Sequence, residues 1–133
     1  SQIIYLENGD YLETKIQSEQ TKLPLSEISL FTRSTKQITK TKTSTYKSAS
    51  GKSMWSVSIT GTFTYNGSSA KCVSCSHSSK TYTTNWTIKS ISSSKKDNSA
   101  TVNAVVVHTY NNTCKTNINK NVTITCSKNG TIS

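Results

Sequence analysis

The segment from Trp55 to Tyr65, "WSVSITGTFTY", decides the fold class. Apolar side chains occupy every second position of this segment, with Gly61 among them, and serine or threonine fills the positions between. Successive side chains of a β-strand point to opposite faces, so the pattern predicts a strand with one face in a core and one toward water.

The flanking segments also show the patterns of β-strands and tight turns. "IIYLENGDYLETKI" predicts an N-terminal hairpin around Asn8-Gly9, and Asn66-Gly67 predicts a second tight turn. "QITKTKTSTY" (37–46) reads as an edge strand whose lysines deter further pairing. Residues 18–34 are expected to form a connection with one helical turn. Further strands are expected near 70–75, 85–91, 99–110 and 121–126.

About seven or eight strands separated by turns predict an all-β fold, an antiparallel sandwich in a single domain over residues 1–133. Within it, residues 1–34 form the hairpin and connection, and residues 35–133 the sandwich body. Apolar residues make up only 32% of the chain, whereas serine and threonine supply 46 of its 133 residues. The threonines alternate with β-branched and aromatic residues, which indicates half-exposed strands rather than disorder.

The net charge of +10 is unevenly distributed. Residues 1–27 contain five of the six acids and two lysines, a net −3, so the remaining residues carry +13. Such a body attracts anionic polymers, glycans or acidic surfaces, although a lysine-rich face that only keeps the protein soluble is the alternative. Because nearly all the bases are lysine, we expect no specific nucleic-acid recognition. The lysines expected to contact a polyanion are Lys36, Lys40, Lys42, Lys47, Lys89, Lys95 and Lys96.

"CVSCSH" (72–77) is the motif in this sequence that most resembles a metal-binding or redox site. A zinc site or a redox C-x-x-C pair are two interpretations, but in a regular strand Cys72 and Cys75 point to opposite faces, which disfavours both. Disulfides remain as the third. Cys126 is in phase with Val122 and Ile124, so we expect Cys72 to pair with Cys126 in the core, which leaves Cys75 to pair with Cys114 at the surface.

The order Cys72, Trp86, Cys126 resembles that of immunoglobulin-like sandwiches, in which a buried tryptophan packs on a disulfide between the sheets. The resemblance implies a disulfide-stapled, immunoglobulin-like β-sandwich. Ile124 occupies the place of the family's corner tyrosine, so the exact topology is left open.

"WSVSITGTFTYNGSSAKC", "NWTIKSISSSKKDNSATV" and "NVTITCSKNGTIS", together with "YLENGDY", resemble small secreted proteins of Gram-positive, Firmicute-type bacteria. That pattern has one cysteine at each place matched by Cys72 and Cys126, which makes Cys75 and Cys114 an additional pair. The resemblance implies an extracellular or cell-envelope location and carries no activity with it.

Two features of the chain agree with a secreted protein. The longest wholly apolar run, Ala104 to Val107, is too short to cross a membrane, so no transmembrane segment is expected. The sequence starts without methionine, which is expected of a mature secreted protein or of a chain that has been trimmed.

Catalytic chemistry has few candidates. Glu7 and Glu13 are the conceivable carboxylate pair, and Cys114 with His108 the conceivable nucleophile and base, while His77 reads as exposed. We therefore expect no enzyme activity, metal or cofactor. The predicted function is a non-catalytic secreted or cell-surface binding or adhesion module for an anionic polymer, a glycan or a host protein. The alternative is a secreted effector such as a bacteriocin-like antimicrobial or a protease inhibitor.

Overall fold

The computed structural model describes residues 2–18, 35–109 and 115–133, and these form two antiparallel β-sheets with no helix. The predicted all-β class is therefore confirmed, whereas the helical turn expected within 18–34 lies outside the described residues. The strands are β1 (Gln2–Tyr5), β2 (Tyr11–Ser18), β3 (Lys36–Lys47), β4 (Ser53–Tyr65), β5 (Ala70–Thr81), β6 (Trp86–Lys96), β7 (Ser99–Thr109) and β8 (Lys115–Thr125).

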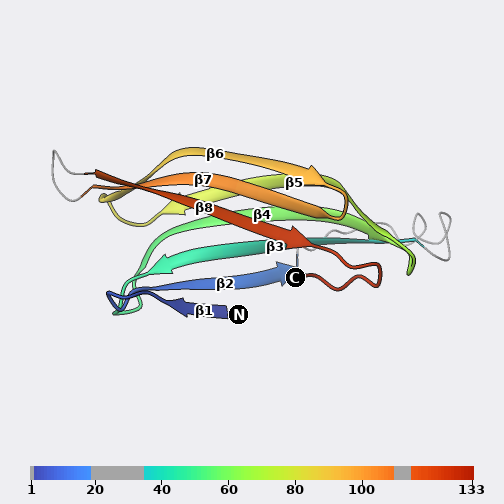
Figure 1. The fold of residues 1–133 in the computed structure, drawn as a ribbon, viewed down its shortest axis with the longest axis horizontal. Helices are drawn as coiled ribbons and strands as arrows, with labels where there is room; N and C mark the ends of the chain where they lie inside the picture. Colours follow the sequence, from blue (N-terminus) through green and yellow to red (C-terminus); the bar gives the residue numbers. More distant parts are fainter. Residues whose placement is uncertain (1, 19–34, 110–114) are drawn as a thin grey trace.

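The strands follow one another in sequence order within each sheet. The first sheet has the order β1-β2-β3-β4-β5 and the second the order β6-β7-β8 (Figure 1). Immunoglobulin domains instead connect their sheets by Greek-key crossovers. The immunoglobulin-like topology is thus not confirmed, and the two sheets are simple meanders.

The smaller sheet covers only part of the larger one. β8 lies over β3 and β4, β7 over β4 and β5, and β6 beside β5, so β1 and β2 extend beyond β8 (Figure 1). β3 is therefore an interior strand, paired with β2 from Lys40 to Lys47 and with β4 along its length. The prediction that 37–46 is an edge strand is wrong, because the N-terminal hairpin adds two strands beyond it.

Two predicted turns are confirmed. Gly9 closes the β1–β2 hairpin with a φ of 88°, and Gly67 lies between β4 and β5 with a φ of 86°. Glycine adopts this left-handed region without the steric cost that a side chain adds, which explains both Asn-Gly pairs.

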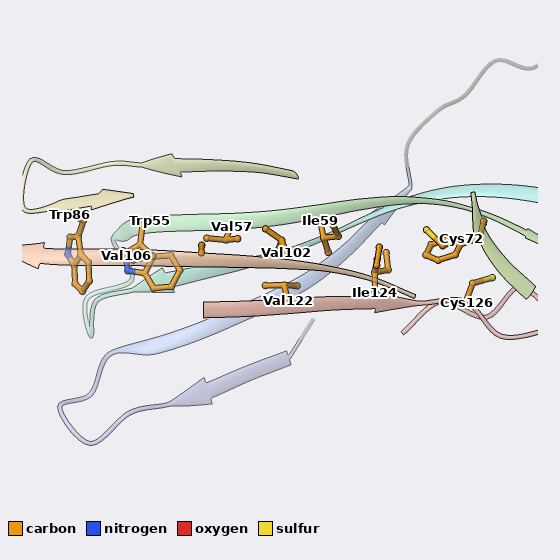
Figure 2. Close-up of a cluster of buried hydrophobic side chains, with 13 residues drawn as sticks. Trp55, Val57, Ile59, Cys72, Trp86, Val102, Val106, Val122, Ile124 and Cys126 are labelled. Atoms are coloured by element: carbon orange, nitrogen blue, oxygen red, sulfur yellow. The ribbon is translucent and has the colours of Figure 1, made fainter. Parts of the chain in front are cut away.

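The core confirms the reading of β4. Its inward row of Trp55, Val57, Ile59 and Phe63 is at most 1% exposed. Figure 2 shows Trp55, Val57 and Ile59 among the side chains of the core. The second sheet contributes further buried side chains from β7 and β8, among them Val102, Val106, Val122 and Ile124.

The outward row of the same sheet accounts for the abundance of threonine. Hydroxyl groups pair across β3 and β4, with 2.9 Å between Thr39 and Thr62 and 2.7 Å between Thr41 and Thr60. Such cross-strand pairs stabilise a sheet face that has no apolar cover.

Ser44 is an exception in the inward row of β3. Its side chain lies opposite Val57, the residue is 1% exposed, and its Oγ has no hydrogen-bond partner among the described residues. A buried hydroxyl without a partner costs about 1–3 kcal/mol. We expect Ser44→Ala to raise the free energy of unfolding by about 1 kcal/mol, measured by urea denaturation.

Ser58→Ala provides the matched control for this prediction. Ser58 Oγ lies 2.7 Å from Thr43 Oγ1 on the opposite face, so its removal should destabilise the protein. Equal destabilisation by both variants would contradict the interpretation of Ser44.

Trp86 lies at the opposite end of the core from the cysteines (Figure 2). Its ring centroid is 5.1 Å from that of Tyr46, 6.2 Å from that of Trp55 and 4.0 Å from that of His108, with the His108 ring nearly parallel. The packing of tryptophan on a cysteine pair, which the immunoglobulin resemblance implies, is therefore not what this chain does.

Candidate binding surface

The seven lysines expected on one face are divided among three places. Lys36, Lys40 and Lys42 share the inward row of β3, since Lys40 and Lys42 lie opposite Gly61 and Ile59. Lys89, Lys95 and Lys96 belong to β6 in the other sheet. The prediction of a single lysine-rich face is therefore not supported by the positions of these strands.

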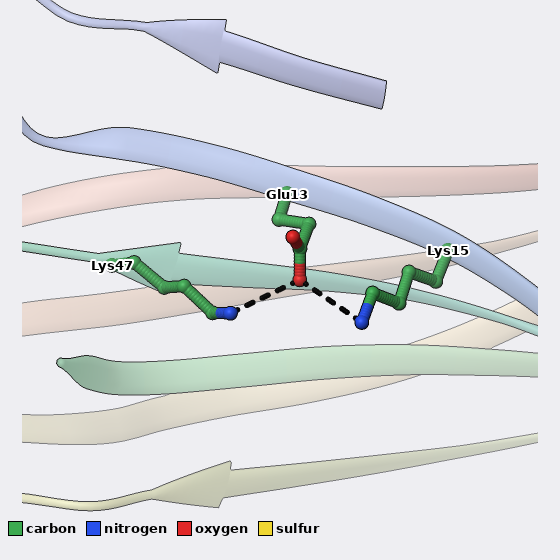
Figure 3. Close-up of polar contacts among 3 residues, drawn as sticks. All are labelled: Glu13, Lys15 and Lys47. Carbon is green, nitrogen blue, oxygen red and sulfur yellow. Dashed lines mark hydrogen bonds and ion pairs between the residues drawn. The ribbon is translucent and has the colours of Figure 1, made fainter. Parts of the chain in front are cut away.

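Lys47 lies on the outer face of the first sheet and is engaged in an ion pair. Its Nζ is 3.1 Å from Glu13 Oε1, and Lys15 Nζ is 3.3 Å from the same oxygen (Figure 3). The hydrogen bond from Lys47, together with Lys15, lowers the pKa of Glu13 below its ordinary value. Glu13 is thus committed to two lysines, which argues against its use as half of a catalytic carboxylate pair.

A lysine pair forms where β3 meets β8. Lys42 Nζ donates a hydrogen bond of 3.0 Å to the carbonyl oxygen of Thr123. Lys120 lies in the inward row of β8, and burial, with a further contribution from Lys42, lowers the pKa of Lys120. Two cations therefore approach one another at the rim of the core.

Carboxylates lie elsewhere among the residues that the structure describes. Both ion pairs found there belong to Glu13 on the outer face. Asp10 accepts a 2.7 Å hydrogen bond from the Tyr46 hydroxyl and one of 3.0 Å from the amide of Ala49. The charges of Lys42 and Lys120 are thus not matched by an acid in residues 2–18, 35–109 and 115–133.

An apolar strip continues from this lysine pair onto the uncovered hairpin. Ile16 is the direct cross-strand partner of Lys42, and Leu12 of β2 is the partner of Ile4 in β1. Ile16 is 42% exposed and Ile4 59% exposed, because no strand of the second sheet covers them. We call this region, made of Ile4, Leu12, Ile16, Lys42 and Lys120, the open-edge surface.

The sequence reasoning missed Lys120, although a signal was present. In "NINKNV" it lies two positions from both Ile118 and Val122, so the alternation of β8 already places Lys120 in the inward row. A lysine in a row of buried apolar residues is exceptional and therefore informative.

The cysteines differ from the expectation because β5 contains a bulge. Phe63 pairs with Cys72 but Thr62 pairs with Ser74, so Val73 is an extra residue in β5. Cys75 then lies opposite Gly61, on the same inward face as Cys72. The prediction that Cys72 and Cys75 point to opposite faces is wrong.

Cys72, Cys75 and Cys126 are thiols in the structure, and no disulfide links them. Burial raises the pKa of Cys72, as does neighbouring Cys75. Burial also raises the pKa of Cys126, and Cys72 adds to that shift. The three cysteines therefore gather at one end of the core, and for Cys72 and Cys126 the neutral thiol is the favoured form.

The β6–β7 turn holds the backbones of the two buried cysteines. The amide of Cys72 donates to the carbonyl of Asp97 over 2.7 Å, and that of Cys126 donates to the carbonyl of Asn98 over 3.0 Å. The Asn98 side chain donates in return to the carbonyl of Cys126 over 2.7 Å. Two adjacent turn residues thus bring β5 and the end of β8 close together.

Cys114 lies outside the described residues, so its predicted pairing with Cys75 stays a prediction.

The two histidines occupy separate places. His77 is exposed, as predicted, and its Nδ1 lies 2.7 Å from Ser93 Oγ, whereas His108 stacks on Trp86. Among the described residues, no group of three histidine, cysteine or acidic side chains is placed to hold a metal ion. The described part of the chain also has no helix long and apolar enough to cross a membrane.

Comparison of the chain with protein-family models, with curated proteins and with solved structures finds no match in any of the three.

Proposed function

We propose that this protein is a non-catalytic, extracellular or cell-envelope binding module whose open-edge surface takes an anionic polymer. The observation that carries the proposal is the pair formed by Lys42 and Lys120, two inward-row cations without a matching acid in the described residues. The polymer class is one with repeated phosphate or sulfate groups, as in teichoic-acid-like chains and sulfated glycans.

The pKa of Lys120 supports this assignment. A lowered pKa means that the folded protein disfavours the charged form, so at neutral pH the charge of Lys120 costs stability. This cost is present below the folded pKa and disappears above the ordinary lysine pKa, where both folded and unfolded chains are neutral at this position. An anion bound between the two lysines offsets this cost, so binding of the anion is favoured.

The extracellular location is supported by the four cysteines and by the resemblance of residues 54–133 to secreted Gram-positive proteins. In an oxidising compartment we propose that Cys72 and Cys126 form a disulfide between the two sheets. Their backbones are tied to adjacent residues of one turn, and their side chains lie in the same cluster (Figure 2). Such a disulfide between the two sheets is a feature of immunoglobulin-like sandwiches, here in a fold whose strands follow a meander order.

The test is binding of fluorescent heparin and of poly(glycerol phosphate) to wild type and to the double variant Lys42→Gln, Lys120→Gln. Each partly exposed charge contributes about 0.5–1 kcal/mol, so we expect roughly 5- to 30-fold weaker binding at low salt. Binding by wild type should fall as salt rises, since screening at 0.1 M acts over about 10 Å.

Lys89→Gln, Lys96→Gln is the matched control, because it removes two lysines from the far edge of the other sheet. We expect this control to change affinity less than about twofold, and urea denaturation should show that neither double variant is unfolded. Equal losses in both double variants would show attraction by net charge alone. No binding to either polymer at 20 mM salt would refute the proposal.

A further inference from the structure

Strand β1 is an unprotected sheet edge. Nothing among the described residues pairs with the side of β1 that faces away from β2. β1 has no charged residue, no proline and no bulge, and Ile3, Ile4 and Tyr5 are 46%, 59% and 71% exposed. Natural proteins usually guard such an edge with charge, proline or a bulge.

The other three sheet edges each have a feature that hinders pairing with a further strand. β5 and β6 close on one another through the 2.7 Å contact of His77 with Ser93, and each of them contains a bulge. At the C-terminal end of β8, Lys42 donates a hydrogen bond to the carbonyl of Thr123, and Ser133 pairs with Thr125. The rest of β8 carries the charges of Lys115 and Lys120. The absence of protection is therefore confined to β1 in the described residues.

The exposed apolar side chains are concentrated at the same place. Of the seven exposed large hydrophobic residues that the structure describes, five belong to the N-terminal hairpin. These five are Ile3, Ile4, Tyr5, Leu6 and Ile16. An exposed patch of this kind marks an interaction site.

Charge favours a second copy of the chain as the partner. The hairpin region 2–18 contains Glu7, Asp10 and Glu13 against Lys15, a net −2, in a chain of net +10. Approach through β1 brings together the two least basic parts of the molecule, whereas approach through the body opposes two strongly positive surfaces. Glu13 is already paired with lysines, which reduces the repulsion between the hairpins further.

The sequence of β1 suits pairing with itself. Two antiparallel strands related by a twofold axis through the sheet keep the same face up, so Ile4 can lie opposite Ile4 of the partner copy. In that register Ile3 lies opposite Tyr5 of the other copy, and every facing pair within Ile3–Tyr5 is apolar. Such cross-strand pairs are favourable, and a one-residue shift would break the match of faces.

We propose that β1 mediates self-association, in which two copies pair their β1 strands antiparallel and form one continuous ten-stranded sheet. A four-residue strand buries much less than the roughly 800 Å² per partner of a standard interface, so the dimer is weak. We expect a dissociation constant on the order of 100 µM. The association uses the edge of β1 and not the lysine pair, although Ile4 also belongs to the open-edge surface.

Sedimentation velocity of the wild-type protein from 5 to 500 µM, in the presence of reductant, tests this proposal. We expect the weight-average sedimentation coefficient to rise with concentration. Ile4→Lys should abolish the rise, because two lysines would face each other across the axis. Val73→Lys is the matched control, since Val73 is 42% exposed on the bulge of β5 and gains the same charge, and it should associate as wild type does.

Hydrogen exchange provides a second readout that does not depend on a variant. The amides of β1 should become more protected between 5 and 500 µM, while those at the rim of β8 should not change. A monomer at every concentration would overturn the proposal. Association that persists in Ile4→Lys, or that is lost equally in Val73→Lys, would also overturn it.

Discussion

Replacing Phe63 by alanine is expected to lower the free energy of unfolding by about 3–5 kcal/mol. Phe63 is fully buried, and its ring occupies the space that a side chain at position 61 would need. A Cβ at Gly61 would lie 2.6 Å from Cζ of Phe63 and 3.4 Å from a methyl carbon of Ile124. Denaturation in urea followed by tryptophan fluorescence measures the loss.

Gly61→Ala tests the same contact from the other side. It should destabilise by about 1–3 kcal/mol, because the added methyl overpacks the core against the ring. In the double variant the alanine methyl enters the space vacated by Phe63. The loss of unfolding free energy in the double variant should therefore be smaller than the sum of the losses in the two single variants. Additivity within about 0.5 kcal/mol would contradict the close packing of these residues.

Oxidation is expected to have a comparable effect in the opposite direction. A Cys72–Cys126 disulfide closes a loop of 54 residues, for which chain entropy predicts about 4 kcal/mol of stabilisation. The free energy of unfolding should therefore be higher without reductant than with it, and Cys126→Ser should remove the difference. Cys75→Ser is the control and should preserve it. Equal stability with and without reductant, or a peptide map that joins Cys72 to Cys75, would refute the staple.

The pH dependence of the reduced protein gives an independent check on the same cysteines. Burial raises the pKa of both Cys72 and Cys126, so the neutral thiols contribute stability that is complete below the ordinary thiol pKa. This contribution should be lost as the pH rises toward the folded pKa, because the unfolded chain ionises first. The oxidised protein has no such thiols and should lack this alkaline loss.

The alternation of apolar and polar residues predicts the core, because the two-residue period of a strand and the hydrophobicity of each side chain are enough to identify the buried row. Trp55, Val57, Ile59 and Phe63 are buried as expected, and so are Val122 and Ile124. The Asn-Gly turns were equally readable, since the left-handed backbone they require is a local property.

The register of β5 was not readable from the sequence. "AKCVSCS" contains no glycine or proline to mark the extra residue, and the bulge at Val73 arises from pairing with β4. One unmarked residue was enough to reverse the side on which Cys75 lies. The position of β3 in the sheet could not be predicted either. Its lysines are typical of an edge strand, and only the structure shows that β2 pairs with it.

The binding surface could be predicted only in part. The excess of lysine was evident from the sequence, but which lysines meet depends on how the two sheets are stacked. Lys42 and Lys120 are far apart in sequence and come together only because β8 lies over β3. No described strand of the second sheet covers the hairpin, because that sheet is the smaller one, and no local pattern encodes its size.

The sequential order of the strands has a consequence for how the chain folds. Among the described strands, each pairs only with the strand just before or after it in the chain, so none of them must wait for a distant partner. Loop-closure entropy is therefore modest at each step, and zipping can advance from either end of a sheet. The slow event should be the docking of the β6–β8 layer on the β1–β5 layer, so variants of Ile59 and Ile124 should alter the folding rate more than those of Ile16.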